Sequence, residues 1–188
     1  MSNNAMNVTQ AKPKVTGAVS AAPAGTTLPT DATTALPATF KSLGYISDSG
    51  LTNSVSIESA SQKAWGGDVV LASETGRTDT FKLQFLETMN ADVLKAVYGD
   101  SNVSGTLETG LTVKANGLDK TEKVYVFDMI LRGGYVKRIV VPQGMITAMG
   151  DVVYKDSEAT VYDLTITGTP DTDGQTHYEY TAKPAGGD

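Results

Sequence analysis

The residue types that most often carry enzyme chemistry are scarce in this chain. His177 is the only histidine, and there is no cysteine. A hydrolase built on His177 would also need an activated serine, but no Gly-x-Ser-x-Gly motif occurs. The lack of cysteine excludes a thiolate nucleophile, a disulfide and a cysteine-type zinc site. We therefore predict no catalytic residue and interpret His177 as a surface histidine on a strand.

Metal and phosphate motifs are equally incomplete. Asp171-Thr172-Asp173-Gly174 resembles the start of a calcium loop, but Ala182 stands where the bidentate glutamate of such a loop belongs. No glycine-rich loop ends in Gly-Lys-Ser/Thr, so a Walker-type phosphate site is excluded. The sequence predicts no metal and no cofactor, and it favours a tight turn at residues 170–174.

Composition narrows the possible partners. The 188 residues suit one domain, or one domain plus a tail, and the net charge is −6. An acidic chain should not hold DNA through its phosphates, because nonspecific affinity comes from lysine and arginine displacing counterions. The chain shows no signal-peptide pattern and no apolar stretch of membrane-spanning length, so we expect no membrane association.

The first 37 residues differ from the rest. They are rich in alanine, threonine and proline, and their only charged side chains are Lys12, Lys14 and Asp31. This composition is typical of a disordered leader. It also fits an extended N-terminal arm that orders against a neighbouring subunit, because the segment carries spaced apolar anchors, namely Val15, Val19, Leu28 and Leu36.

Residues 38–182 have the pattern of a single β domain, and residues 183–188 of a flexible end. Residues 59–79, with Trp65-Gly66-Gly67-Asp68, indicate a protruding loop or hairpin. Alternating and apolar segments between turn signals predict eight or nine strands. The candidates are Phe40–Ser47, Leu51–Ser61, Thr80–Glu87, Leu107–Lys114, Lys123–Arg132, Tyr135–Val141, Met145–Tyr154, Thr160–Thr167 and Thr176–Thr181.

One short helix is expected at residues 90–98. Asn90 is a suitable N-cap, Asp92 favours the first turn, and Gly99 can end the helix. A helix this short is not stable alone, so it must pack on a sheet. The predicted fold is mainly β: an antiparallel sandwich or partial barrel with one flanking helix and an extended N-terminal arm.

The order of several motifs resembles one protein family, the major tail tube proteins of long-tailed phages with non-contractile tails. The likeness runs from about Gly17 to Thr181. It is carried by Gly25–Thr30, Leu43–Leu51, Ala64–Asp68, Phe81–Glu87 and Ala91–Gly99.

The resemblance implies a structural virion protein that is not an enzyme. Six copies would form a ring whose inner strands merge into one barrel, and rings would stack into a tail tube that conducts DNA without binding it specifically. Long loops and the N-terminal arm would link the rings. Further partners would be the tail terminator, tape-measure and distal tail proteins, with assembly in the host cytoplasm. The alternatives are a virion decoration or adhesion module and, less favoured, a secreted β-barrel enzyme.

The expected tube suggests roles for particular residues. A lumen wall should present small polar side chains to water. Ser54, Ser56 and Glu58 on one strand, with Lys82 and Gln84 on the next, fit that requirement, and Lys82 is expected to pair with Glu58. A second candidate face holds Asp163, Thr165 and Thr167.

Contacts between rings are expected from four residues: Trp65, Asp68, Leu28 and Leu36. Trp65 has two interpretations that the sequence leaves open. It is either a core residue or an anchor in the next ring.

Overall fold

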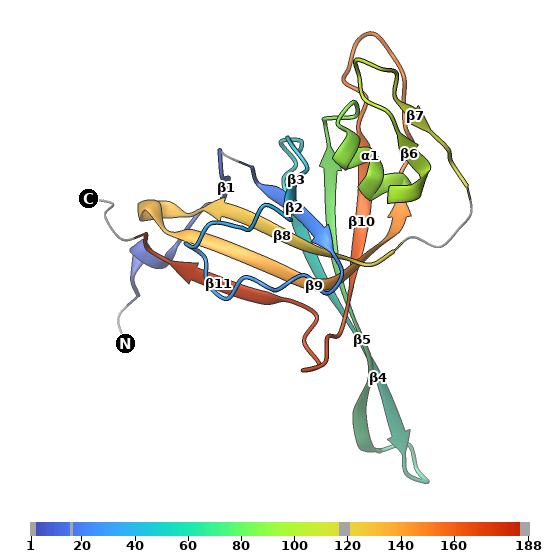
Figure 1. The fold of residues 1–188 in the computed structure, drawn as a ribbon. Coiled ribbons are helices and arrows are strands. Elements are labelled where there is room, and N and C mark those ends of the chain that lie inside the picture. Colours follow the sequence, from blue (N-terminus) through green and yellow to red (C-terminus); the bar gives the residue numbers. More distant parts are fainter. Residues whose placement is uncertain (1–2, 16, 117–120, 185–188) are drawn as a thin grey trace.

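The computed structural model describes residues 3–15, 17–116 and 121–184. Within that part of the chain, nine strands form one antiparallel sheet, shown in Figure 1, with the main order β3-β2-β8-β9-β10-β5-β4. Strand β1 adds to β8 and β11 to β9, and the sheet does not close into a barrel. The nine strands are β1 (Lys12–Pro13), β2 (Val19–Pro23), β3 (Lys41–Ser42), β4 (Thr52–Lys63), β5 (Val69–Phe85), β8 (Lys123–Ile130), β9 (Val136–Met149), β10 (Tyr162–Thr169) and β11 (Tyr178–Ala182).

The remaining elements are short. Strands β6 (Val103–Ser104) and β7 (Thr112–Val113) form a separate pair, and α1 spans Ala91–Tyr98. Three single 3-10 turns complete the described chain: η1 (Ala5–Asn7), η2 (Asp100–Asn102) and η3 (Arg132–Gly134). The predicted flexible end lies largely outside the described residues, since only residues 183 and 184 of it are included.

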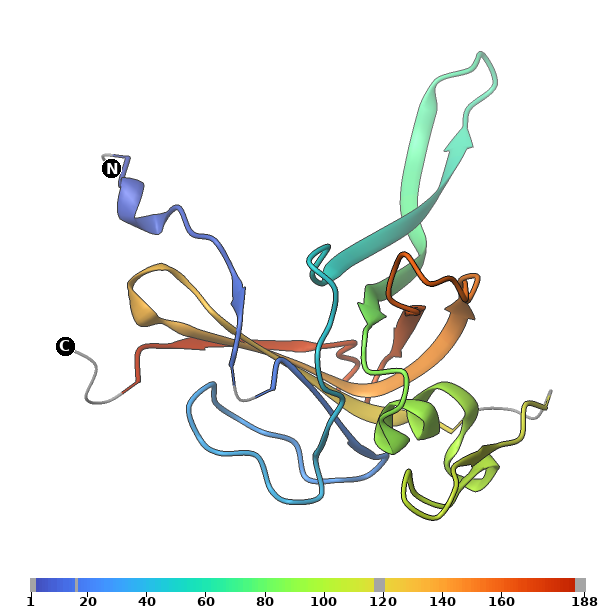
Figure 2. The ribbon, with the colours of Figure 1, turned by 90° about the horizontal axis from the view of Figure 1, so that it is seen from above.

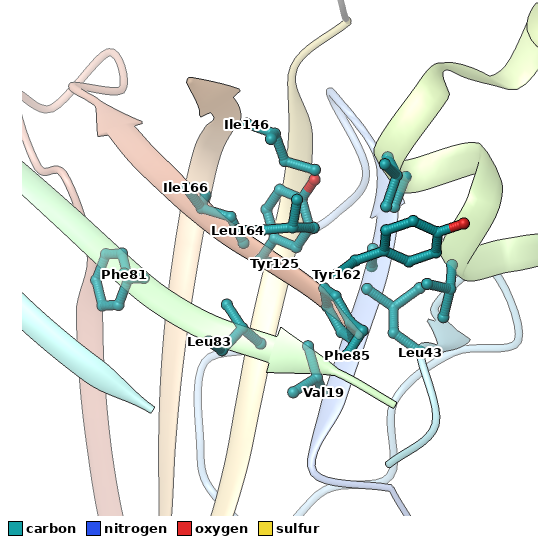
Figure 3. Close-up of a cluster of buried hydrophobic side chains, with 14 of the residues drawn as sticks. Val19, Leu43, Phe81, Leu83, Phe85, Tyr125, Ile146, Tyr162, Leu164 and Ile166 are labelled. Carbon is teal, nitrogen blue, oxygen red and sulfur yellow. The ribbon is translucent and has the colours of Figure 1, made fainter. Parts of the chain in front are cut away.

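The main core lies on one face of the sheet, where buried residues alternate with more exposed ones along β10 and along residues 79–85 of β5. Phe81, Leu83 and Phe85 are buried, and they lie beside Leu164 and Ile166 of β10. Side chains of successive strand residues point to opposite faces, so the residues between them face away from this core. Figure 3 shows this cluster gathered between β5, β10 and the strands behind them.

The predicted short helix forms as α1 and covers this core. Asn90 caps it by accepting a hydrogen bond from the Asp92 amide at 2.9 Å, and Gly99 follows with a φ of 97°. Val93 and Val97 are completely buried against the sheet. Among the described residues, no helix has the length and apolar character needed to cross a membrane.

A second core covers the opposite face of β2, β8 and β9. Its buried residues are Ala22, Phe40, Val124, Val126 and Val140. The segment between β2 and β3 lies over them and contributes Leu28 and Leu36, both half-buried. Leu28 and Leu36 thus pack on their own chain, and their assignment to contacts between rings stays a prediction for the part of each side chain that remains exposed.

The predicted N-terminal arm needs a correction. Residues 19–23 are not part of an arm, because they form β2 and pair along β8 from Val19↔Phe127 to Pro23↔Lys123. Val19 and Ala21 are buried in the main core. Small side chains gave this segment a linker-like composition, whereas its pairing depends on a strand about 100 residues later.

Other strand boundaries also differ from the prediction. Phe40–Ser47 reduces to β3 and an isolated bridge between Ile46 and Phe85, and Leu107–Lys114 reduces to β7. Two predicted strands merge into β9, which runs through Pro142 and Gly144. The pairing register between β8 and β9 shifts beside Pro142, because proline has no backbone N–H to donate to the neighbouring strand. Gly144 is needed there, because a Cβ would lie 2.7 Å from the Tyr125 ring.

The long hairpin of β4 and β5 leaves the body of the molecule. Strand β10 accompanies β5 only as far as Gly168↔Asp79, so the outer half of the hairpin has no third strand. Most of residues 59–79 are regular strand, exposed on both faces. Figures 1 and 2 both show the hairpin ending far from α1.

Candidate functional site

The two polar faces expected from the sequence form one surface. Ser54 lies opposite Thr80, and Thr80 lies opposite Thr167. Directly opposed residues of an antiparallel pair point to the same side. The shared face runs over β4, β5 and β10, away from the main core, and holds Thr52, Ser54, Ser56, Glu58, Thr78, Thr80, Lys82, Gln84, Asp163, Thr165 and Thr167.

Hydrogen bonds link neighbouring strands across this polar face. The Lys82 ammonium lies 3.4 Å from Asp163 Oδ2, and Gln84 Nε2 donates to the same oxygen at 3.2 Å. The hydroxyls of Thr147 on β9 and Thr167 are 2.7 Å apart, which extends the face to a fourth strand. The face is therefore dominated by hydroxyl groups, and hydrogen bonds cross it between neighbouring strands.

The expected ion pair between Lys82 and Glu58 is wrong. Glu58 lies opposite Gly76, about 20 Å along β5 from Lys82 at ~3.3 Å per residue. Lys82 pairs with Asp163 instead, in an exposed contact that contributes little stability. One lysine against two carboxylates leaves the polar face with a charge near −1. Such a surface has no array of cations with which to hold DNA phosphates.

The hairpin is anchored at its root by a buried carboxylate. Asp79 is 1% exposed, and its oxygens accept hydrogen bonds from Asn53 Nδ2 at 2.6 Å, from the Thr176 hydroxyl at 2.9 Å and from His177 Nδ1. His177 is thus half-buried and precedes β11, so its assignment as a surface strand histidine is wrong. Thr176 and His177 both bind Asp79 Oδ2, and the threonine hydroxyl is not bonded to the imidazole. The arrangement is therefore a structural anchor and not a catalytic chain of hydrogen bonds.

The tip of the hairpin is a glycine turn that displays Trp65. The Ala64 amide donates to the Asp68 carbonyl at 2.8 Å, and Gly66 and Gly67 adopt φ values of 122° and 100° that favour glycine. Trp65 is fully exposed, so the core interpretation is wrong. Other large apolar residues of the hairpin are also exposed: Val55, Ile57, Val69, Val70 and Leu71. Several large apolar side chains exposed on one protruding hairpin make it a candidate binding surface.

A buried ion pair missed by the sequence analysis holds the segment between β2 and β3. Arg138 is 0% exposed and donates to both oxygens of Asp128, at 2.7 and 2.9 Å. Its Nη1 also donates to the carbonyls of Asp31 and Thr34, at 3.0 and 2.9 Å. Hydrogen bonds from Thr34 and Thr33 lower the pKa of Asp31 and close this turn. The sequence does carry a signal for this pair, because Asp128 and Arg138 are charged residues within otherwise largely apolar strands.

The calcium-like sequence at residues 171–174 is a turn. Asp171 Oδ1 accepts the amides of Asp173 and Gln175, and Oδ2 accepts the Tyr178 hydroxyl at 2.7 Å. The Gln175 amide is the main cause of the lowered pKa of Asp171, and the bond to Asp171 raises the pKa of Tyr178 to about 12. Across the described ranges, no group of three histidine or carboxylate side chains is arranged to hold a metal.

Comparison with known proteins gives one match that covers nearly the whole chain. A family model described as phage tail tube protein matches residues 1–185. No curated protein sequence matches. Among solved structures, the chain is similar to the anti-feeding prophage cap, a tube terminating cap determined by cryo-EM. That likeness has a TM-score of 0.46 and 10% identity over 91% of this chain and 93% of the other.

Proposed function

This chain belongs to the phage tail tube protein family, and from that premise we propose that six copies form a ring and that rings stack into a tube that conducts DNA. The family is one of structural virion components, not of enzymes. The finer steps of the proposal are the face that lines the lumen, the strand edges that join copies within a ring, and the contact between rings.

The polar face is the observation that best supports this function. A sheet that bounds a water-filled channel needs one face in the protein core and the other covered with small polar groups. The last seven residues of β5, β10 and the end of β9 combine these properties, and β4 extends the polar face beside them. We assign the polar face, with Ser54, Ser56, Glu58, Lys82 and Gln84, to the lumen, where DNA slides past hydrated hydroxyls without a cationic hold.

The two outer strands of this four-stranded unit offer edges for joining copies. Strand β4 pairs only with β5 among the described strands. At the other end, β8 stops pairing with β9 at Lys123↔Gly144, so residues 145–149 have a described strand on one side only. The strands β9, β10, β5 and β4 alternate in direction, so β4 runs opposite to β9. In a head-to-tail ring, β4 of the next copy would therefore lie antiparallel to β9. Head-to-tail pairing of this kind can close into a ring and removes the exposed edges.

Engineered disulfides test the edge pairing, because the chain has no cysteine of its own. We expect Thr147→Cys combined with one of Ser54→Cys, Ser56→Cys or Glu58→Cys to cross-link tubes under mild oxidation. Non-reducing gels should then show a ladder whose largest species is a hexamer, since a ring closes on itself. Thr147→Cys with exposed Thr109→Cys is the matched control and should stay monomeric.

The outcomes separate the steps of the proposal. Tubes in the microscope with none of the three cross-links would refute the β4–β9 pairing and leave the tube function standing. A purified protein that remains a monomer or trimer, and forms no tubes on a tail initiator, would refute the function and favour a decoration or adhesion module.

Added positive charge tests the lumen assignment. Thr165→Lys with Thr167→Lys places two cations on the polar face of each copy, or twelve in a ring of six. Purified tubes of this variant should bind short duplex DNA about tenfold or more tightly than wild-type tubes at 50 mM salt, and lose most of that binding by 200 mM. Fluorescence anisotropy measures both values.

A matched variant carries the same added charge elsewhere. Thr109→Lys with Tyr154→Lys alters two exposed loop positions off the polar face. If this control binds DNA as strongly as the Thr165 and Thr167 variant, or if a density map of the tube places Lys82 and Gln84 on the exterior, the lumen assignment is wrong.

A further inference from the structure

The apolar side chains at the hairpin tip are not buried within one subunit. Trp65 is fully exposed, and Val69 and Leu71 are each 58% exposed beside it. No described strand accompanies this half of the hairpin, and the described part of the subunit leaves these side chains exposed. The glycine turn holds Trp65 at the extreme end of the molecule, as Figures 1 and 2 show for the hairpin.

A pocket of about 420 Å³ lies at the opposite end of β5, where the chain passes from that strand into α1. We call it the end pocket, and it is lined by Leu86, Glu87, Thr88, Met89, Asn90 and Leu107. Met89 is 65% exposed and Leu107 60% exposed, so its apolar wall also lacks a partner within the subunit. A methionine in such a wall adapts readily to an aromatic ring.

One carboxylate gives the end pocket its charge. Glu87 Oε1 accepts the Tyr45 amide at 3.0 Å and Oε2 accepts Asn90 Nδ2 at 2.9 Å, which fixes its position at the pocket wall. No cation lines this pocket. At the hairpin, Lys63 precedes the turn and is exposed. An approaching tip would therefore bring the Lys63 ammonium toward the Glu87 carboxylate.

A second pocket, beside exposed Tyr45, is the competing acceptor. It also includes Glu87, but Lys14 lines it as well. A lysine there would repel Lys63 and cancel part of the attraction of Glu87. Charge therefore favours the end pocket.

We propose that Trp65 of one copy inserts into the end pocket of a copy in the adjacent ring; this inference rests on the stacking proposed above. Every copy carries the tip at one end of β5 and the pocket at the other, so the contact is heterologous and repeats without closing. Trp65 and Met89 are 24 positions apart, so tip and pocket are separated by at most about 79 Å at ~3.3 Å per residue. The axial repeat of the tube must lie below that length.

A cross-link that preserves Trp65 tests the contact. We expect the double variant Ala64→Cys with Met89→Cys to assemble into tubes. Mild oxidation should then link position 64 of one copy to position 89 of a copy in the adjacent ring. Because the link joins rings, the ladder on a non-reducing gel should continue past six copies, unlike a link within a ring. Ala64→Cys with Tyr45→Cys reports the competing pocket, and Ala64→Cys with Val153→Cys is an exposed control; both should remain uncross-linked.

Charge variants give a second readout. Lys63→Glu should raise the critical concentration for tube formation about fivefold or more, because it replaces an attraction to Glu87 by a repulsion. Asp68→Asn, which removes the other charge of the tip, should leave that concentration unchanged or lower it. Both residues are exposed, so neither change should alter the melting temperature of the monomer.

The failures are distinguishable. Tubes that give the Ala64–Tyr45 link, or no link to Met89, overturn the end-pocket contact while the tube function stands, as does an axial repeat longer than about 79 Å. Equal effects of Lys63→Glu and Asp68→Asn also overturn it. Absence of tubes from the unmodified chain refutes the proposed function itself.

Discussion

Trp65→Ala is expected to abolish tube formation while leaving the folded subunit almost unchanged. The side chain is fully exposed and lies at the end of the hairpin, so its removal costs the monomer no packing. Surface changes of this kind usually alter the free energy of unfolding by less than about 0.5 kcal/mol, which for a domain of this size is about 2 °C in Tm.

The loss in assembly should be large because the contact repeats. A buried tryptophan at the centre of an interface typically contributes at least about 2 kcal/mol, so six such contacts would remove on the order of 12 kcal/mol between two rings. Thermal unfolding of the monomer and negative-stain microscopy of assembly reactions measure the two effects separately.

Two control variants sharpen this result. Tyr154→Ala removes another exposed aromatic residue, 78% exposed and in a loop away from the hairpin, and should form normal tubes. Trp65→Phe retains an aromatic ring and should restore part of the assembly. Normal tubes from Trp65→Ala would show that Trp65 makes no essential contact between rings. A fall of more than about 5 °C in Tm would contradict its exposed position.

Arg138→Ala is expected to cause the largest loss of subunit stability, about 3–5 kcal/mol. The change leaves the Asp128 carboxylate buried without the two hydrogen bonds of the guanidinium, and it leaves the carbonyls of Asp31 and Thr34 without their donor. Natural domains have only about 5–15 kcal/mol of stability, so this loss is a large fraction of the total. Urea unfolding followed by circular dichroism measures it.

The same variant should release the segment between β2 and β3 before the sheet itself unfolds. Hydrogen exchange at residues 31–36 should therefore accelerate more than exchange in β10. Lys14→Ala is the matched control, because Lys14 also lies 3.4 Å from Asp128 but is about one-third exposed; its loss should cost less than about 1 kcal/mol. If Arg138→Ala lowers the free energy of unfolding no more than Lys14→Ala does, Arg138 does not hold this segment as described.

The family resemblance and the mainly β fold were both accessible from the sequence, and the family match and the structure confirm them. The helix was predicted within a residue because Asn90 and Gly99 act locally, through hydrogen bonds and φ angles inside one turn. The apolar residues Phe81, Leu83 and Phe85 were predicted to face inward for a similar reason, since alternation along a single strand reports which side is buried.

Long-range pairing was the part that the sequence could not supply. Strand β2 has small side chains, and it becomes a strand only because β8 offers an unpaired edge to it. The unity of the polar face depends on the register that places Thr80 beside both Ser54 and Thr167. His177 looked like a surface residue because nothing nearby in sequence indicates Asp79, which is about a hundred positions earlier.

Local signals thus determined the mainly β character, the helix ends and the likeness to tail tube proteins, because each depends on a few neighbouring residues. Tertiary structure alone decided that Leu28 and Leu36 cover their own subunit, that Arg138 is buried with Asp128, and that Trp65 stands free. Whether a side chain is buried depends on which residues pack against it. In an antiparallel sheet those residues are set by the pairing register between distant segments, and a local sequence pattern carries no information on that register.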